Sequence, residues 1–131
     1  MTNVFEIQKT VQNEHIDDLG HVNNVVYLQW VQDISNEHWN LLKEGYDTSN
    51  FVWVVLRHEI DYSGQALLND RLTVKTWIGE TAGIKSIRHV QIEKNNKPIV
   101  KVETTWCLID SKSMRPKRIT GDILTILKQH S

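Results

Sequence analysis

Hydrophobic residues change their spacing twice along the chain. Residues 4–11 alternate between apolar and polar side chains, which predicts a first strand. Residues 12–24 are polar and rich in turn formers, and after them apolar positions recur every three or four residues. The repeating positions are Tyr27, Val31, Ile34, His38 and Leu41, widened by Leu28 and Leu42. This spacing is typical of one face of a long amphipathic helix.

The expected helix has clear signals at both ends. Asn23 or Asn24 is a good N-cap, because an Asn side chain accepts a hydrogen bond from a free backbone N–H of the first turn. Gly45 follows the last apolar position and predicts the stop.

Period-two patterns return after the helix and predict four more strands. One face of the first of these consists of Val52, Val54, Leu56, His58, Ile60 and Tyr62. Residues 72–78 and 100–108 also alternate cleanly, whereas 84–93 is poorly patterned because Ser86 and Arg88 share a face with apolar residues. Asn95 and Asn96 form a candidate hairpin turn. Residues 119–127 suggest a short last helix with Thr120 as its cap.

The order strand, helix and four strands predicts an α+β fold. Successive hairpin-linked strands form an antiparallel sheet, and the single helix should lie across it. Such a sheet has two open edges and one helix to cover it, so pairing with a second copy is favoured. We therefore expect a homodimer or homotetramer.

Composition narrows the class of protein. The 131 residues carry 15 Lys and Arg against 16 Asp and Glu, so no basic field attracts nucleic acid or an anionic membrane. No apolar run reaches membrane-spanning length, and the first residues lack the features of a signal peptide. Lone Cys107 fits a reducing compartment. We expect one domain over residues 1–131 and a cytoplasmic location.

The stretch from Asp17 to Trp30 resembles the signature of the hotdog-fold acyl-CoA thioesterases of the 4-hydroxybenzoyl-CoA thioesterase group. An Asp-x-x-Gly motif stands before the helix, and Gly20 and Tyr27 keep that group's spacing. The run His-Val-Asn-Asn-Val-x-Tyr is more similar to plant acyl-ACP thioesterases, a branch of the same fold. Further likeness lies in the segments 69–74, 83–86 and 115–119. The resemblance implies a hotdog fold, in which an antiparallel sheet wraps around one central helix.

Thioester hydrolysis needs an activated water or nucleophile and donors for the developing oxyanion. The free N–H groups that open a helix supply such donors, and Asp17 stands shortly before the predicted helix. The resemblance implies that Asp17 is the general base or the nucleophile and that the backbone amide near Asn24 polarises the carbonyl. Asp18 is the neighbouring competitor, but the Asp-x-x-Gly spacing selects Asp17.

Other positions are weaker candidates. His21 matches a motif His of the plant branch, but that branch's accompanying Asn and Glu are replaced here by Leu19 and Ser63. His38 lies on the apolar stripe of the predicted helix, so we interpret it as a core residue. The spacing of the His residues indicates no metal site. We also expect no cofactor. The resemblance adds four substrate-binding candidates, the cationic ones near the phosphate groups of CoA. These four are Tyr27, Lys85, Ser86 and Arg88.

The sequence thus predicts hydrolysis of an acyl-CoA or acyl-ACP thioester to carboxylate and free thiol. Two alternatives remain at this stage: a hydratase or dehydratase acting on acyl thioesters, and a non-catalytic module that binds them. Acyl chain length stays open, because it depends on how the Trp and aliphatic side chains meet in the folded protein.

Overall fold

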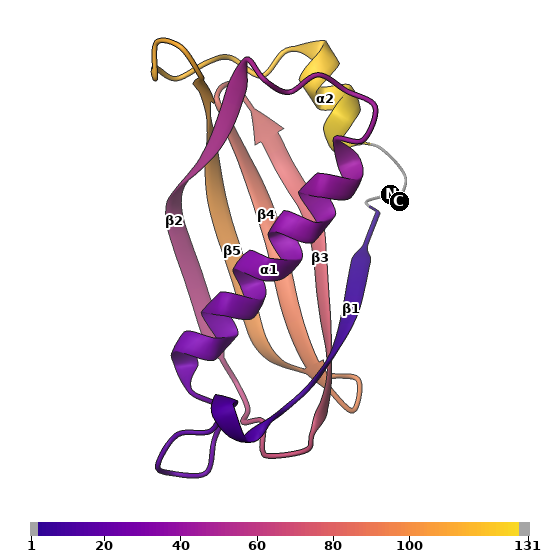
Figure 1. Cartoon of the computed structure of the whole chain (residues 1–131), viewed down its shortest axis with the longest axis vertical. Helices are drawn as coiled ribbons and strands as arrows, with labels where there is room; N and C mark the ends of the chain where they lie inside the picture. Colours follow the sequence, from indigo (N-terminus) through magenta and orange to yellow (C-terminus); the bar gives the residue numbers. More distant parts are fainter. Residues whose placement is uncertain (1–2, 129–131) are drawn as a thin grey trace.

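A computed structural model describes residues 3–128 as one curved antiparallel sheet with a long helix across its concave face (Figure 1). The elements are β1 (Phe5–Thr10), a short 3₁₀ turn η1 (Asn13–His15), α1 (Asn24–Leu42), β2 (Phe51–Tyr62), β3 (Arg71–Ala82), β4 (Lys85–Lys94), β5 (Lys97–Asp110) and α2 (Gly121–Leu127). The predicted α+β class is confirmed. The ends of the predicted 1–131 domain, residues 1–2 and 129–131, lie outside the described residues.

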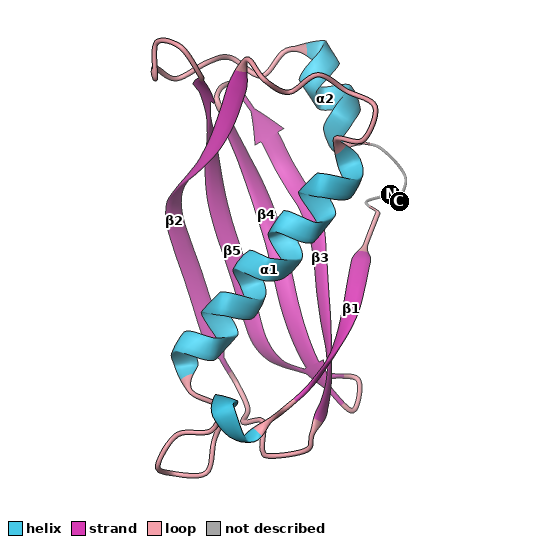
Figure 2. Cartoon of the chain, viewed as in Figure 1, coloured by secondary structure: helices cyan, strands magenta, loops and turns pink. Residues whose placement is uncertain are grey.

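The sheet has five strands in the order β1-β3-β4-β5-β2, and every neighbouring pair is antiparallel. β1 and β2 are therefore the edges, and α1 crosses the sheet diagonally between them (Figure 2). The β4–β5 hairpin turns at Asn95 and Asn96, which both have positive φ, as the sequence predicted. No helix within residues 3–128 has the length and hydropathy that crossing a bilayer requires.

α1 begins and packs largely as its sequence predicts. The Asn23 side chain caps it by accepting a hydrogen bond from the Val25 N–H at 3.1 Å. The buried side chains are Tyr27, Trp30, Val31, Ile34, Ser35, His38 and Leu42. The prediction was wrong at Leu41, which is exposed, because the buried stripe turns to Leu42 at the end of the helix.

β2 does not keep one face along its length, contrary to the prediction. Its register against β5 shifts between Val55 and Arg57, so Leu56 is an extra residue in a β-bulge. Phe51 and Trp53 pack under α1 before the bulge, whereas Ile60 packs on the core after it. The alternating pattern does not show this phase change, because residues 51–56 are apolar on both faces and so do not mark which face points inward.

The core under α1 has two apolar clusters, one at each end of the helix. The first joins the N-terminal half of α1 to β3, β4 and β5, and the second joins Leu42 and Phe51 to α2. Polar side chains occupy the middle of the sheet's inner face: Thr76, Arg88, Thr104 and His58. The weak pattern of β4 therefore has a structural reason, since Ser86 and Arg88 are buried members of its inner face.

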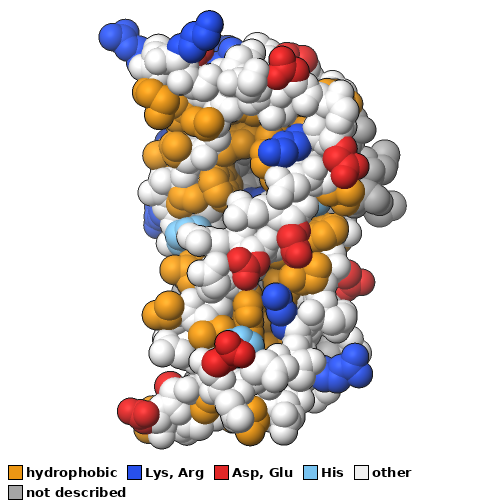
Figure 3. Space-filling view, in the orientation of Figure 1, with side chains coloured by type: hydrophobic (Ala, Val, Ile, Leu, Met, Phe, Trp, Pro, Cys, Tyr) orange, Lys and Arg blue, Asp and Glu red, His pale blue; other side chains and the backbone are white. Residues whose placement is uncertain are grey.

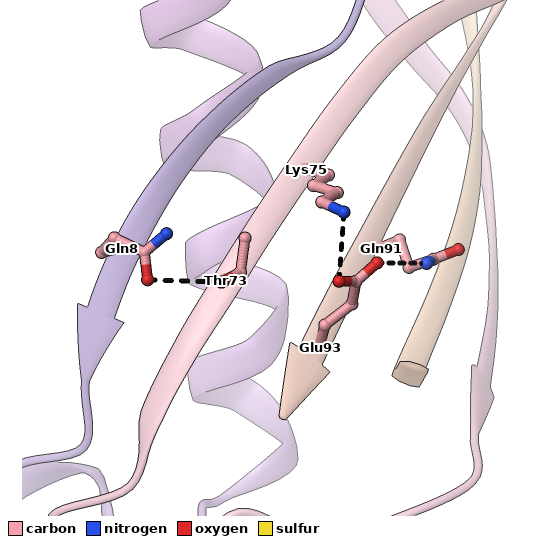
Figure 4. A network of polar contacts seen from close by, with 5 residues as sticks. All are labelled: Gln8, Thr73, Lys75, Gln91 and Glu93. Carbon is pink, nitrogen blue, oxygen red and sulfur yellow. Dashed lines mark hydrogen bonds and ion pairs between the residues drawn. The ribbon is translucent and has the colours of Figure 1, made fainter. Parts of the chain in front are cut away.

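The opposite face of the sheet is stabilised by polar contacts between strands (Figure 4). Glu93 accepts from the ammonium of Lys75 at 3.1 Å and from the Gln91 amide at 2.6 Å. The Thr73 hydroxyl donates to Gln8 across the β1–β3 pair at 3.3 Å. These side chains point away from α1, which therefore covers only one of the two faces.

His38 makes the stability of this fold depend on pH. Burial and the adjacent Arg88 guanidinium lower the pKa of His38 to about 4, whereas an unfolded His titrates near its ordinary value. Between these two pKa values the unfolded chain binds the proton more readily than the folded protein does. The contribution of neutral His38 to stability is therefore complete at neutral pH and is lost as the pH falls. We expect the free energy of unfolding to drop by about 2 kcal/mol from about pH 8 to about pH 5 through this group.

Urea unfolding at a series of pH values measures this slope. A matched variant, His38→Gln, keeps an acceptor for Arg88 but cannot titrate. Between about pH 8 and about pH 5, its free energy of unfolding should fall by about 2 kcal/mol less than that of the wild type. His58, whose pKa burial also lowers, is present in both proteins and cancels from the comparison. An equal pH dependence of the free energy of unfolding in the wild type and in His38→Gln would contradict this role of His38.

Candidate active site

The segment before α1 forms a closed loop. Ile16 and Val22 pair as an isolated antiparallel bridge, and the loop between them turns at Gly20, whose φ is 81°. A side chain at Gly20 would strain this conformation, although space around it is open. The backbone N–H of Val22 donates to Ala66 at 3.0 Å and so ties the loop to the β2–β3 connection. The loop is thus held at both ends and leads directly into the helix.

Asp17 organises the inside of this loop. Its Oδ1 accepts hydrogen bonds from the backbone N–H groups of Leu19 at 2.9 Å and His21 at 3.1 Å. Its own N–H donates to the carbonyl of His21 at 2.8 Å. Within the described chain no hydrogen bond uses Oδ2, and the residue is only partly buried. One oxygen therefore fixes the carboxylate and the other remains available for a water or a substrate.

The helix start next to the loop offers an unused donor. The side chain of Asn23 occupies the N–H of Val25, and its carbonyl accepts from Val26 at 2.9 Å. The N–H of Asn24 has no hydrogen-bond partner among residues 3–128, and Asn24 is exposed. At a helix N-terminus such a group carries partial positive charge from the macrodipole. It can donate to a carbonyl oxygen on which negative charge develops.

His21 and Tyr27 support the loop and the helix in different ways. His21 contributes its backbone to the Asp17 loop, and no hydrogen bond of its imidazole is found in the described part of the chain. The Tyr27 side chain is 1% exposed, and its hydroxyl accepts from the N–H of Ala66 at 3.1 Å. Burial raises the pKa of Tyr27, so the phenol stays neutral. Contact of either side chain with substrate stays a prediction.

A cavity of about 320 Å³ lies beside the C-terminal half of α1, and Figure 3 shows the hollow lined with hydrophobic side chains. Its walls come from α1, β2, β3, β4, β5 and the last turn of α2. Ser86 and Arg88 line it, whereas Lys85 is exposed at the start of β4. The predicted substrate-binding residues of β4 are therefore not one group. Arg88 is a buried cation of the cavity wall, whereas Lys85 is a cation on the surface. Asp17 and Asn24 do not line this cavity.

Sequence reasoning missed most of the cavity's walls. The aromatic lining residues are Trp39, Phe51, Trp53 and Trp106. They come from three elements that are distant in sequence, so no local motif marks them. The available signal was the pair Ser86 and Arg88 on an otherwise apolar strand face.

Glu59 and Cys107 have structural surroundings. Glu59 forms an ion pair with Arg57 at 2.7 Å, and both side chains are more than half exposed. Cys107 is buried, and its thiol faces the carbonyl of Leu108. No group of three His, Cys, Asp or Glu within residues 3–128 is arranged to hold a metal ion.

The antiparallel sheet wrapped around one central helix is a hotdog fold. A family model for the N-terminal domain of acyl-ACP thioesterases matches residues 2–127, and the chain belongs to this family.

Individual relatives agree with this family. The chain is 24% identical over 132 residues to the long-chain acyl-CoA thioesterase FadM of Escherichia coli, covering 95% of this chain and 98% of FadM. An acyl-ACP thioesterase structure from Bacteroides thetaiotaomicron superposes with a TM-score of 0.84 at 18% identity, covering 98% of this chain and 54% of that one. The Staphylococcus aureus protein SAV2348, solved in complex with CoA, gives a TM-score of 0.83 at 17% identity, with coverages of 100% and 89%.

Replacing Tyr27 by Phe should weaken the anchor beneath the site. The change leaves the N–H of Ala66, a fully buried residue, without an acceptor, at a cost of about 1–2 kcal/mol in the free energy of unfolding. Urea denaturation measures the cost, with Tyr46→Phe at an exposed position as the matched control. Equal stability of the two variants would show that the Tyr27–Ala66 hydrogen bond contributes little.

Proposed function

We propose that the protein hydrolyses acyl-CoA thioesters, with Asp17 as the catalytic carboxylate and the N–H of Asn24 as the oxyanion donor. The observation that carries the proposal is the pairing of Ile16 with Val22, which closes a loop bearing a carboxylate directly before a helix with an unpartnered first amide. Both groups required for acyl transfer to water are thereby present on one short segment.

The free Oδ2 of Asp17 takes a proton from a water molecule as that water attacks the thioester carbon. The carbonyl oxygen becomes an oxyanion, which accepts a hydrogen bond from Asn24 N–H at the positive end of the α1 dipole. Collapse of the tetrahedral intermediate breaks the C–S bond, and the leaving thiolate takes the proton that Asp17 removed from water and departs as the free thiol. In the alternative route, Asp17 attacks the carbon itself and expels the thiolate to form an anhydride, and water then hydrolyses this anhydride and protonates the thiolate. The two backbone N–H bonds to Oδ1 orient the carboxylate in either route.

The proposal includes a homodimer that pairs along β2. This strand is an open edge of the sheet and carries exposed apolar side chains at Val52, Val55 and Leu56. Two further large apolar side chains, Leu19 and Val25, are more than 70% exposed at the Asp17 loop and the helix start. Exposed apolar residues at an open edge and beside a catalytic carboxylate favour an interface there.

Two-fold pairing along β2 connects the site to the cavity. α1 runs antiparallel to β2, since the rings of Tyr27 and Tyr62 lie 5.9 Å apart at one end and those of Trp39 and Phe51 lie 6.1 Å apart at the other. An antiparallel β2 pair brings the Tyr62 end of one copy beside the Phe51 end of the other. The Asp17 loop of one copy then faces the cavity of the second. The thioester lies at the loop, and the acyl group enters the cavity.

CoA is the proposed carrier, supported by the likeness to FadM and to a protein solved with CoA. The family description names acyl-ACP, so acyl carrier protein is the alternative carrier. Turnover of matched acyl-CoA and acyl-ACP substrates separates the two.

Asp17→Asn should lower kcat for thiol release from acyl-CoA by about 100-fold to 10,000-fold, the usual contribution of a positioned general base. The amide oxygen still accepts the two loop N–H bonds, so the loop and the fold should persist, which circular dichroism can check. Asp18→Asn is the matched control at the adjacent exposed carboxylate and should retain wild-type turnover. Wild-type kcat in Asp17→Asn would disprove the assignment.

Leu56→Lys should convert the dimer to monomers and reduce turnover with it. The change puts a charge on the bulged edge of β2, where the side chain is 53% exposed in one copy and buried in the proposed pair. Light scattering coupled to size exclusion measures the mass. Val4→Lys, at a similarly exposed site before the opposite edge strand, is the control. A monomeric wild type, or a dimeric and fully active Leu56→Lys, would contradict the β2 interface.

A further inference from the structure

The cavity beside α1 combines aromatic walls with hydrogen-bond donors. Arg88 is 6% exposed and lines it from the inner face of β4. Trp53 and Trp106 contribute aromatic walls, and their indole Nε1 atoms are buried without a hydrogen-bond partner among residues 3–128. Buried donors are nearly always paired in native proteins, so a guanidinium that is only partly paired at a cavity calls for an acceptor inside it.

Arg88 has partners for only part of its guanidinium. Nη1 donates to Nδ1 of His38 at 2.8 Å and to Oγ1 of Thr76 at 3.0 Å. Among the described residues, no hydrogen bond uses Nε or Nη2. Because Arg can only donate, His38 must accept through an unprotonated Nδ1 and is therefore neutral. Neither partner balances the positive charge.

No described lining residue of the cavity supplies a counter-ion for this charge. Its lining includes the cations Lys43 and Arg88 but no Asp or Glu, and none of the ion pairs within residues 3–128 involves Arg88. Burial lowers the pKa of Arg88 to about 10, so the group still carries its charge at neutral pH. An uncompensated buried charge is strongly destabilising, and a bound carboxylate removes that penalty.

We propose that the cavity binds the acyl group of a thioester whose far end carries a carboxylate, with Arg88 binding that carboxylate. The proposal deepens the thioesterase function and rests on it. The substrates are ω-carboxyacyl thioesters, the half-thioesters of dicarboxylic acids. Arg88 is then a specificity-determining residue, separate from the catalytic Asp17.

The shape of the cavity favours this ligand over the phosphates of CoA. Trp39, Phe51, Trp53, Ile78 and Trp106 give it mostly apolar walls, which suit methylene groups or an aromatic ring. A volume of about 320 Å³ fits a short to medium acyl chain rather than a nucleotide together with its phosphates. Its charged lining residues, Lys43 and Arg88, are both cations, which suits one terminal anion on an otherwise apolar group.

The first test compares kcat/KM for ω-carboxyacyl-CoAs and methyl-ended acyl-CoAs of equal carbon number, from about four to twelve carbons. At the chain length that fits, the wild type should prefer the carboxylate-ended substrate by about 10-fold to 100-fold, the range for a charged hydrogen bond. Arg88→Met removes the charge at similar volume and should abolish or reverse this ratio. Arg71→Met, an exposed Arg on β3, should retain it.

Arg88→Gln provides a second variant should Arg88→Met fail to fold. It removes the charge but keeps donors for His38 and Thr76, and it should also lower the ratio. A wild-type preference for methyl-ended chains at every length, or a ratio that neither variant changes, would overturn the proposal while leaving the thioesterase function intact.

Binding tests the carboxylate site without any hydrolysis. Tryptophan fluorescence should report tighter binding of an alkanoate than of the alkanol of equal length, and Arg88→Met should remove that difference. If no thioester is hydrolysed, the thioesterase proposal fails, whereas this binding difference still decides whether Arg88 recognises a carboxylate. Equal binding of alkanoate and alkanol to the wild type would refute the recognition of a carboxylate by Arg88.

Discussion

A single helix has to cover one face of a five-stranded sheet, and the other features of the molecule follow from this constraint. α1 buries one stripe of side chains and packs into two apolar clusters near its ends. It leaves an aromatic cavity beside its C-terminal half and β2 as an open edge. Its N-terminus, tied to the β2–β3 connection through Tyr27 and Ala66, presents at Asn24 an amide with no hydrogen-bond partner among residues 3–128, next to the Asp17 loop. In the proposed dimer, a second copy covers the open edge and joins this loop to the cavity.

The proposed site has two polar parts with separate roles, one at the start of α1 and one in the middle of the sheet's inner face. In the proposed mechanism, the Asp17 loop and the start of α1 supply the carboxylate and the hydrogen-bond donor for the reaction. The middle of the sheet supplies Arg88, which His38 and Thr76 hold in place without neutralising it. A buried cation of this kind costs stability unless a ligand pairs with it, so its presence is better explained by binding than by folding. Catalysis and acyl selection can therefore change independently by substitution.

Local signals predicted the elements well, because they depend on residues close in sequence. The Asn23 cap, the Asn95–Asn96 turn and the helical stripe each involve one turn or one face, and all three are present. The bulge at Leu56 was missed because residues 51–56 before and at it are apolar on both faces, so the pattern does not mark the inward face of that half of β2. The position of Asp17 before the helix followed from the family spacing, whereas the cavity did not, since Trp53, Arg88 and Trp106 meet only through strand pairing. Arg88 had been grouped with Lys85, yet burial separates the two.

The most direct measurement is a crystal structure of the Asp17→Asn variant with an intact acyl-CoA. The account predicts a dimer paired along β2, with the thioester oxygen within hydrogen-bond distance of the Asn24 N–H and the acyl group in the cavity of the second copy. A thioester bound away from the start of α1, with residue 17 remote from its carbon in both copies, would contradict it.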